Sequence, residues 1–239
     1  MESARFRAQE WFVNPDLVRV SSACDRRFGR VLGATAVALA LAELGRTPSR
    51  VLDVGCGHGE VLDILRRQLP AAELVGVDPA AAAVAATRDR FALDHRVTVL
   101  EAGAEDLGPA GAGAQAGQFD LALVHLTLAL WPDPVDGLCA VLDRLAPGGL
   151  CYVLELLRPA DEVALAACLA PATGPAEARY VREQLALWPS REEAAALVAA
   201  VGRRSGRSAR LLFRGFAELA VMSEVDSAAT PNVWHVFLS

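Results

Sequence analysis

Residues 51–60 read VLDVGCGHGE, an apolar strand pattern that runs into a glycine-rich turn and then into the start of a helix. Gly55, Gly57 and Gly59 allow the backbone to approach a ligand without a Cβ atom in the way, and the first turn of the following helix offers free N–H groups. The stretch predicts a ligand-binding turn at the carboxyl end of a parallel strand.

The glycine spacing argues against a dinucleotide as the ligand. In the GxGxxG pattern of dinucleotide enzymes the third glycine would stand where this chain has Glu60. A glutamate in the first turn of the helix also adds negative charge beside a pyrophosphate, which is unfavourable. Asp78 ends the next apolar run, at the position where a carboxylate meets a ribose diol in this kind of fold. A ligand with a ribose and no phosphate fits best.

Outward from this turn, short apolar runs alternate with helical patterns, which is typical of a parallel sheet covered by helices. Strands are expected at 50–54, 73–78, 96–101, 119–124 and 150–155. Helices are expected at 58–68, 79–93 and 134–145. The spacing predicts an α/β fold with a doubly wound, Rossmann-like sheet.

The N-terminal part of the chain predicts an addition to this core. Residues 1–49 begin with aromatic residues and contain a helix pattern over 24–44 that ends at a glycine and a proline. We expect 1–49 to form a helical lid and 50–239 to form the main domain.

Two further additions follow the fifth expected strand. The Ala-rich residues 158–189 predict a pair of short helices inserted over the site, and Ser190 with Glu193 predicts a capping box at the start of the next helix. Near the end of the chain, 216–225 and 233–238 predict an antiparallel strand pair.

The composition excludes several kinds of chemistry. All 23 basic residues are arginine, so the lysines of Schiff-base enzymes, P-loop nucleotidases and Tyr-x-x-x-Lys dehydrogenases are absent. The formal net charge of −6 argues against a nucleic-acid partner. The five cysteines lack CxxC or Cys/His spacing, so we expect free thiols and no metal.

The same sequence bears on compartment and partners. Its longest uncharged run, 163–176, is interrupted by prolines and shorter than the ~20 residues of a membrane span, and its first residues lack the apolar core of a secretory signal. We expect a cytoplasmic monomer or homodimer that acts on a small molecule, with no membrane partner.

Several motifs in order resemble those of the class I S-adenosylmethionine-dependent methyltransferases, across residues 50–238. They are VLDVGCGHG, LVGVDPA, AGAEDL at 102–107, FDLALVHLTLALWPDP at 119–134, LAPGGLCYVLE at 145–155, and SREE before the last helix. The resemblance implies a seven-stranded, mostly parallel sheet with a reversed C-terminal strand. It also implies S-adenosylmethionine as the cofactor.

The resemblance assigns residues to that cofactor. Asp53 and the glycines would line its methionine and ribose end, Asp78 would hold the ribose hydroxyls, and Ala104 would offer its backbone to the adenine. Gly103 stands where the family often has an aspartate for the adenine amino group, so either Glu105 or a backbone carbonyl would replace it. The full set of expected cofactor contacts is Asp53, Gly55, Cys56, Gly57, Gly59, Asp78, Pro79, Ala104, Glu105 and His125.

Reacting groups in open α/β sheets lie beyond the carboxyl ends of the strands, which selects His125 and Glu155. His125 is the expected catalytic residue, because an imidazole could take a proton from a hydroxyl or amine as the methyl group arrives. A structural, hydrogen-bonded histidine is the alternative. Aromatic faces suit a sulfonium cation and an acceptor pocket. The aromatic candidates for substrate binding are Trp11, Trp131, Tyr152, Tyr180 and Trp188.

The leading hypothesis is methyl transfer to an O, N or C atom of a small molecule in secondary metabolism. No Asp/Asn-Pro-Pro-Tyr/Phe motif for methylation of DNA bases is present. One alternative keeps the cofactor without methyl transfer, as in cyclisation of S-adenosylmethionine to azetidine-2-carboxylate with release of methylthioadenosine. Another is a cofactor-binding but inactive partner protein.

Overall fold

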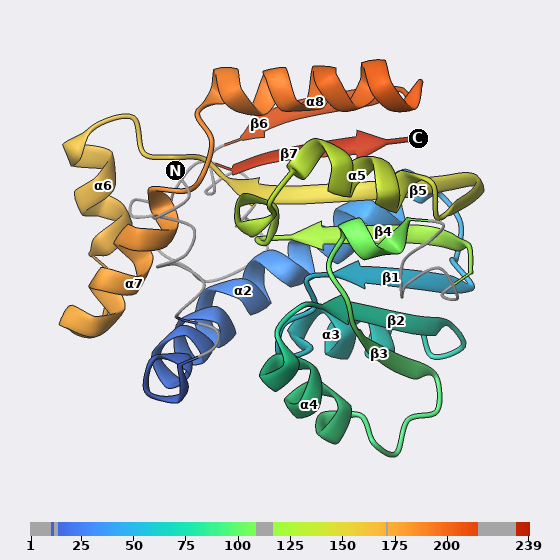
Figure 1. The fold of residues 1–239 in the computed structure, drawn as a ribbon, viewed down its shortest axis with the longest axis horizontal. Helices are drawn as coiled ribbons and strands as arrows, with labels where there is room; N and C mark the ends of the chain where they lie inside the picture. Colours follow the sequence, from blue (N-terminus) through green and yellow to red (C-terminus); the bar gives the residue numbers. More distant parts are fainter. Residues whose placement is uncertain (1–10, 12–13, 109–116, 171, 215–232) are drawn as a thin grey trace.

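The computed structural model describes residue 11 and residues 14–108, 117–170, 172–214 and 233–239 of the 239-residue chain. These residues form one mixed sheet with helices on both faces (Figure 1). The strands are β1 (Arg50–Val54), β2 (Glu73–Asp78), β3 (Val97–Glu101), β4 (Phe119–His125), β5 (Leu145–Leu156), β6 (Ala209–Arg214) and β7 (Val233–Leu238). The α-helices are α2 (Pro15–Leu44), α3 (Glu60–Gln68), α4 (Ala81–Arg90), α5 (Pro134–Leu142), α6 (Glu162–Leu169), α7 (Pro175–Leu185) and α8 (Arg191–Ser205).

The order of strands in the sheet is β3-β2-β1-β4-β5-β7-β6. β7 runs antiparallel to both of its neighbours, whereas β1 to β5 pair in parallel. The expected α/β, doubly wound sheet with a reversed C-terminal strand is therefore confirmed. The first three strands also begin within one residue of their expected positions, because each is a short apolar run bounded by polar residues or glycine.

Two boundaries differ by five residues or more from the expectation. The N-terminal helix starts at Pro15, earlier than the expected 24–44. β5 starts at Leu145, because Leu145 pairs with Phe119 before a bulge brings Leu150 opposite Leu121.

One of the two antiparallel neighbours of β7 also differs from the expectation. It is β6, formed by Ala209–Arg214, whereas the sequence favoured 216–225, a segment that lies outside the described residues.

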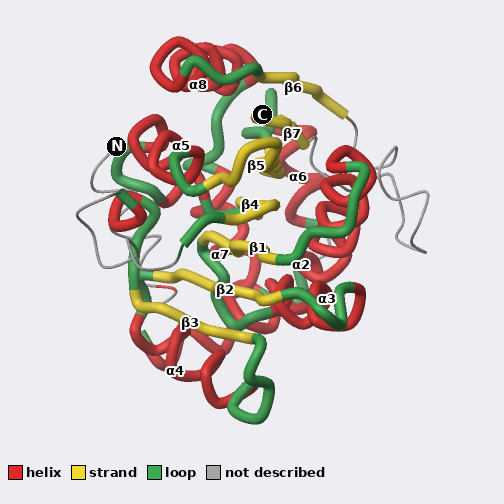
Figure 2. Tube along the Cα trace, turned by 90° about the vertical axis from the view of Figure 1, so that its right-hand side faces the viewer, coloured by secondary structure: helices red, strands yellow, loops and turns green. Residues whose placement is uncertain are grey.

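Each face of the sheet has its own apolar core, and Figure 2 shows α2 and α3 on one side of it and α5 and α8 on the other. Leu32 and Val37 of α2 and Leu62 and Leu65 of α3 pack on the first face. Leu138 of α5 is among the residues packed on the second face, as are side chains of α8. The amphipathic helices therefore hold the strands in a fixed plane, which fixes the positions of the strand ends.

The segment 158–189 leaves the sheet after β5 and returns to it before α8. It contains α6 and α7, as the Ala-rich sequence predicted. Its two ends are joined, because the N–H of Arg158 donates to the carbonyl of Pro189 at 3.0 Å. The helix after it begins with the predicted capping box, in which Ser190 and Glu193 exchange hydrogen bonds.

Candidate functional site

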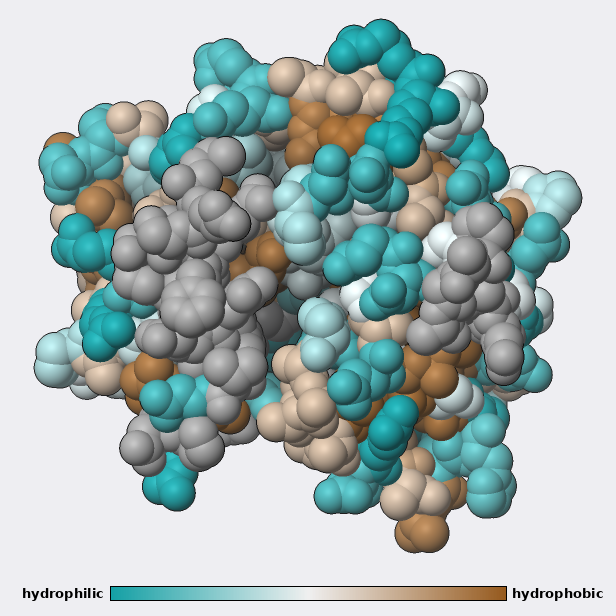
Figure 3. Space-filling model, in the orientation of Figure 1, coloured by the Kyte–Doolittle hydropathy of each residue, from teal (hydrophilic) through white to brown (hydrophobic). Residues whose placement is uncertain are grey.

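The carboxyl ends of the parallel strands meet at one edge of the sheet, beside α2, α6 and α7 (Figure 1). Asp53 lies near the end of β1, Asp78 ends β2, His125 ends β4 and Glu155 lies near the end of β5. The space-filling view has a hollow on this side of the molecule (Figure 3). The edge thus gathers four titratable side chains from four strands.

The three glycines of the turn after β1 have different roles. All have left-handed backbone, with φ of 73° at Gly55, 49° at Gly57 and 78° at Gly59. A Cβ on Gly55 would lie 2.7 Å from Cβ of Thr127, whereas a Cβ on Gly57 would meet nothing within 4 Å. Gly55 is required for packing of two loops, while Gly57 leaves open space for a ligand.

Asp78 holds the turn through the backbone. Its Oδ2 accepts from the N–H of Gly57 and its Oδ1 from the N–H of Ala80, both at 2.9 Å. Burial raises the pKa of this carboxyl, and the two N–H groups oppose that effect. Each oxygen keeps a second lone pair, so the carboxylate can also accept from two hydroxyl groups of a diol. The neighbouring Pro79 is exposed.

Asp53 is buried, and its Oδ2 atom has no hydrogen-bond partner within the described part of the chain. Burial, with the nearby charge of Asp78, raises the pKa of Asp53 to about 8. An unpartnered buried carboxylate is costly, and a cationic ligand would relieve that cost. The Cys56 side chain faces the sheet instead, because its Sγ lies 2.9 Å from where a Cβ on Gly76 would be. Only the backbone of Cys56 remains for a ligand.

The loop after β3 has an unusual arrangement around Gly103. A Cβ on Gly103 would lie 2.7 Å from both carboxylate oxygens of Glu105, so the Glu105 side chain folds back over this glycine. The Asp106 carboxylate accepts from the N–H of Gly103 at 2.9 Å, and Ala104 is buried. The carboxylate of Glu105 thus occupies the region where the side chain of an aspartate at position 103 would begin.

The loop that follows β4 is fixed by Glu155. Its Oε1 accepts from the N–H groups of Thr127 and Leu128, each at 2.6 Å, while its Oε2 has no partner among the described residues. Burial raises the pKa of Glu155 to about 8, against the effect of these two N–H groups. Leu126 has φ of 54°, a strained value for a branched side chain. The sequence located Glu155 at the edge but gave no sign of this anchoring role.

His125 lies at the start of the same loop. Its Cε1 is 3.7 Å from where a Cβ on Gly33 of α2 would be, and its Nε2 is buried without a partner in the described segments. Burial lowers the pKa of His125 to about 4, so the ring is neutral at pH 7. A neutral imidazole with an unused nitrogen can accept a proton.

Two of the aromatic candidates lie near the edge of the sheet. Trp131 is buried against Gly137 of α5, where a Cβ would lie 2.6 Å from its Cε3 and 3.2 Å from Cβ of Ala104. Trp188 is half-buried against the core on the α2 face. Trp131 thus contacts α5, and Trp188 contacts the core that α2 covers.

Trp11 and Tyr180 pack on each other with ring centroids 5.2 Å apart, and Trp11 Nε1 donates to Glu183 at 2.6 Å. They join the N-terminal segment to α7. For Tyr152, the structure corrects the expected contact with the substrate. Tyr152 is fully buried in the sheet core, with its hydroxyl 3.1 Å from Nδ1 of His235, because its position on β5 faces the helices and not the strand ends.

The described residues also bear on metal binding and on membrane insertion. Within the described ranges, no group of three or more His, Cys, Asp or Glu side chains could hold a metal ion. The helices of those same ranges include none that is long and apolar enough to cross a membrane.

Known proteins share both the sequence motifs and the fold. Residues 52–151 match the family model described as a methyltransferase domain. Over 110 residues, 45% of this chain, the sequence is 34% identical to trans-aconitate 2-methyltransferase of Streptomyces avermitilis. The match covers 39% of the length of that relative.

Two similar solved structures cover almost the whole chain. The plantazolicin methyltransferase BamL, solved with a triazolic desmethylPZN analog and SAH, superposes with a TM-score of 0.81 at 21% identity, over 99% of this chain and 95% of its own. BpumL, solved with SAH, gives a TM-score of 0.80 at 22% identity, over 100% and 95%. At this identity they share the fold. The match to a methyltransferase domain therefore spans residues 52–151, and the likeness in fold to these two methyltransferases spans almost the whole chain.

Proposed function

We propose that this protein binds S-adenosylmethionine at the carboxyl edge of the sheet and transfers its methyl group to an O, N or C atom of a small molecule. We also propose that it works in the cytoplasm, in secondary metabolism. The observation that carries the proposal is the buried carboxylate pair of Asp53 and Asp78 beside the open face of Gly57. This cofactor is a cation that carries a ribose and no phosphate, which matches those groups.

Each part of the cofactor has a candidate partner. Asp78 would accept from the ribose hydroxyls, and the free Oδ2 of Asp53 would face the methionine end, where the ammonium group is. Glu105, folded over Gly103, would accept from the adenine amino group, while the backbone of Ala104 would contact the ring. This use of Glu105 is the choice that its position over Gly103 favours.

The proposed reaction needs positioning more than acid–base chemistry. A lone pair on the acceptor attacks the methyl carbon in line with the C–S bond, which breaks with its electrons left on sulfur. Alignment alone can contribute ~7 to 11 kcal/mol. The acceptor proton would pass to Nε2 of His125, which has no partner among the described residues; the lowered pKa keeps the ring neutral at pH 7 but makes it a weaker base than a free imidazole, so its contribution is smaller than that of alignment.

The acceptor would lie between the strand ends and the layer formed by α2, α6 and α7. Trp188 on this side and the packed pair of Trp11 and Tyr180 make that layer aromatic. BamL was solved with a desmethylPZN analog, and its shared fold supports an acceptor of organic, small-molecule character here. The proposed substrate contacts are therefore Trp11, Trp131, Tyr180 and Trp188, without Tyr152.

A product analysis tests this function. Purified protein is incubated with S-adenosylmethionine, alone and with a panel of hydroxy, amino and carbon acceptors, and the nucleoside products are separated by mass. S-adenosylhomocysteine formed only with an acceptor supports methyl transfer. Methylthioadenosine formed without one would replace the proposal with consumption of the amino-acid arm, and failure of the wild-type protein to bind S-adenosylhomocysteine would overturn it.

A further inference from the structure

The C-terminal end of α4, together with Phe91 directly after it, contacts three successive residues of the glycine turn. Thr87 Oγ1 donates to the carbonyl of Gly57 at 2.7 Å, and Arg90 Nη1 donates to the carbonyl of His58 at 2.8 Å. A Cβ on Gly59 would lie 2.7 Å from Cε2 of Phe91 and 2.9 Å from Cγ2 of Thr87. The three contacts form what we call the α4 clamp, made by Thr87, Arg90 and Phe91.

The clamp acts on the peptide groups that a ligand would approach. The N–H of Gly57 donates to Asp78 at 2.9 Å, and the carbonyl of the same residue accepts from Thr87. Both polar groups of Gly57 are therefore fixed, although its left-handed φ of 49° is one of many conformations that a free glycine would visit. The turn keeps its shape before any ligand arrives.

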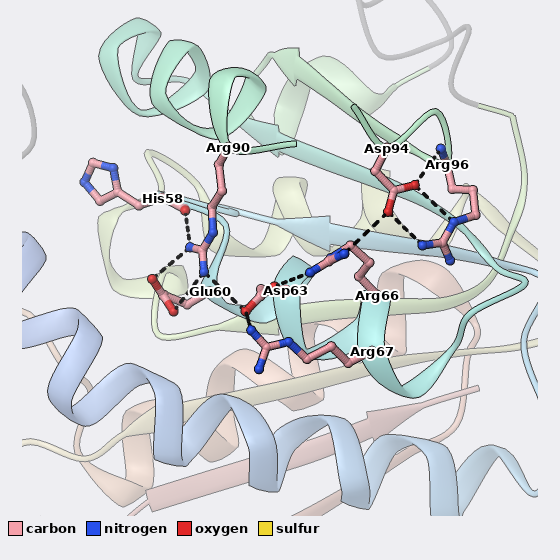
Figure 4. Close-up of polar contacts among 8 residues, drawn as sticks. All are labelled: His58, Glu60, Asp63, Arg66, Arg67, Arg90, Asp94 and Arg96. Atoms are coloured by element: carbon pink, nitrogen blue, oxygen red, sulfur yellow. Dashed lines mark hydrogen bonds and ion pairs between the residues drawn. The ribbon is translucent and has the colours of Figure 1, made fainter. Parts of the chain in front are cut away.

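Arg90 is itself held in place by carboxylates, as Figure 4 shows. Its Nη1 donates to Glu60 at 2.8 Å, and its Nη2 lies 3.4 Å from Asp63, a buried carboxylate that also binds Arg66 and Arg67. The guanidinium can therefore keep a single orientation toward the carbonyl of His58. The ion pair with Arg90 balances the negative charge of Glu60, so the charge of Glu60 alone does not exclude a phosphate ligand.

We propose that Thr87 and Arg90 are positioning residues that preorganise the glycine turn for the cofactor. This inference rests on the proposed function, since it assigns a role in binding the same ligand. Without the clamp, the turn would have to lose conformational freedom on binding, and that cost would appear as weaker affinity. Neither side chain needs to touch the ligand for this effect.

The test measures binding of S-adenosylhomocysteine by calorimetry, which requires no acceptor. Thr87→Val keeps the shape of the side chain and removes the donor, and we expect about 5-fold weaker binding. Arg90→Gln should weaken binding by about 5- to 10-fold, a modest figure because the side chain is partly exposed. Thr87→Ser keeps the hydroxyl and should retain most of the wild-type affinity.

Arg67→Gln is the matched control. Arg67 binds Asp63 at 2.6 Å in the same network, but its described contacts do not include the turn. Binding should stay within 2-fold of wild type in this variant, even where thermal unfolding shifts as much as in Arg90→Gln. Hydrogen exchange of residues 55–60 without ligand should be faster in Thr87→Val and Arg90→Gln than in Arg67→Gln.

The possible results distinguish a failure of the α4 clamp from a failure of the proposed function. Wild-type binding with unchanged affinity in both clamp variants would overturn the clamp and leave the proposed function intact. Equal losses in Arg67→Gln and Arg90→Gln would also overturn it, because they would indicate a general loss of stability. If a clamp variant does not fold, the comparison of Thr87→Ser with wild type and the exchange data on the remaining variant decide the question.

Discussion

The two sides of the site are held together by different forces. The side of the glycine turn is fixed by side-chain hydrogen bonds with backbone groups: Asp78 and Glu155 accept from N–H groups, and the α4 clamp donates to carbonyl groups. The side of α2 and α7 is fixed by packing, with Trp11 against Tyr180 as its main described contact. Backbone hydrogen bonds prescribe one geometry, whereas aromatic packing tolerates change of shape. We propose that the first, the cofactor side, holds the cofactor and that the second, the lid side, contacts the acceptor.

Among the variants that test this comparison, Gly55→Ala should have the largest effect on stability and binding. The new Cβ would overlap Thr127 and sit on left-handed backbone, so the two loops on the cofactor side must separate. We expect a loss of about 3 kcal/mol in the free energy of unfolding, measured by urea titration, together with loss of S-adenosylhomocysteine binding. Gly57→Ala is the control, because only the backbone cost of about 1 kcal/mol applies where the space is open. Equal losses in the two variants would contradict this account.

Glu155→Leu should have the next largest effect. It leaves two buried N–H groups, those of Thr127 and Leu128, without an acceptor, which should lower the free energy of unfolding by about 2 to 3 kcal/mol. Glu155→Gln keeps an acceptor oxygen and should lose much less. Chemical denaturation of both variants checks the difference, and similar stability of the two would mean that these bonds do not anchor the loop.

Asp78→Ala tests the cofactor side without the lid side. Loss of a charged acceptor should weaken S-adenosylhomocysteine binding by about 1 to 3 kcal/mol in calorimetry. Acceptor affinity, measured once an acceptor is known, should change less. Unchanged nucleoside affinity in a folded variant would mean that the ribose lies elsewhere.

The pH dependence of binding follows from Asp53. Its pKa of about 8 means that the carboxyl of the ligand-free protein is largely protonated at pH 6, whereas a cation favours the carboxylate. The affinity for S-adenosylmethionine should therefore rise from pH 6 to pH 8.5, by about 10-fold, with release of a proton on binding. Calorimetry in buffers of different ionisation enthalpy measures that release. Asp53→Asn should flatten the profile, and a wild-type affinity that falls with pH would contradict the assignment.

The smallest effect is expected from Trp11→Phe on the lid side. It removes the hydrogen bond to Glu183 but keeps an aromatic ring against Tyr180, so unfolding should change by about 1 kcal/mol. S-adenosylhomocysteine binding should be unchanged. A large loss of nucleoside affinity would show that the two sides are coupled and would weaken the comparison.

The sequence predicted the ends of the strands that frame the site, but not the contacts between distant segments, for a physical reason. Each strand that ends at or next to Asp53, Asp78 or His125 is a local apolar run, so its end can be located from neighbouring residues alone. Thr87 and Arg90 contact the turn across about 30 positions of sequence, and local patterns carry no signal for such a contact.

Aromatic residues were harder to interpret. Tyr152 was expected to contact the substrate because aromatic faces suit a sulfonium cation, but the alternation of side chains along β5 turns it into the core toward His235. The pairing of β6 with β7 was missed because Ala209–Arg214 contains three charged or small residues among its six. In both cases tertiary pairing, and not local composition, decided the outcome.

The hydrogen bond between Arg158 and Pro189 has a consequence for protein engineering. It closes the segment 158–189 at its base, between the end of β5 and the start of α8. Lengthening such a closed loop costs little, because the closure term grows only slowly with its length. We therefore expect the tip of the segment to tolerate insertions, while the part of α7 that packs on Trp11 has to be kept. If the segment contacts the acceptor as proposed, changes at its tip offer a route to new acceptor specificity.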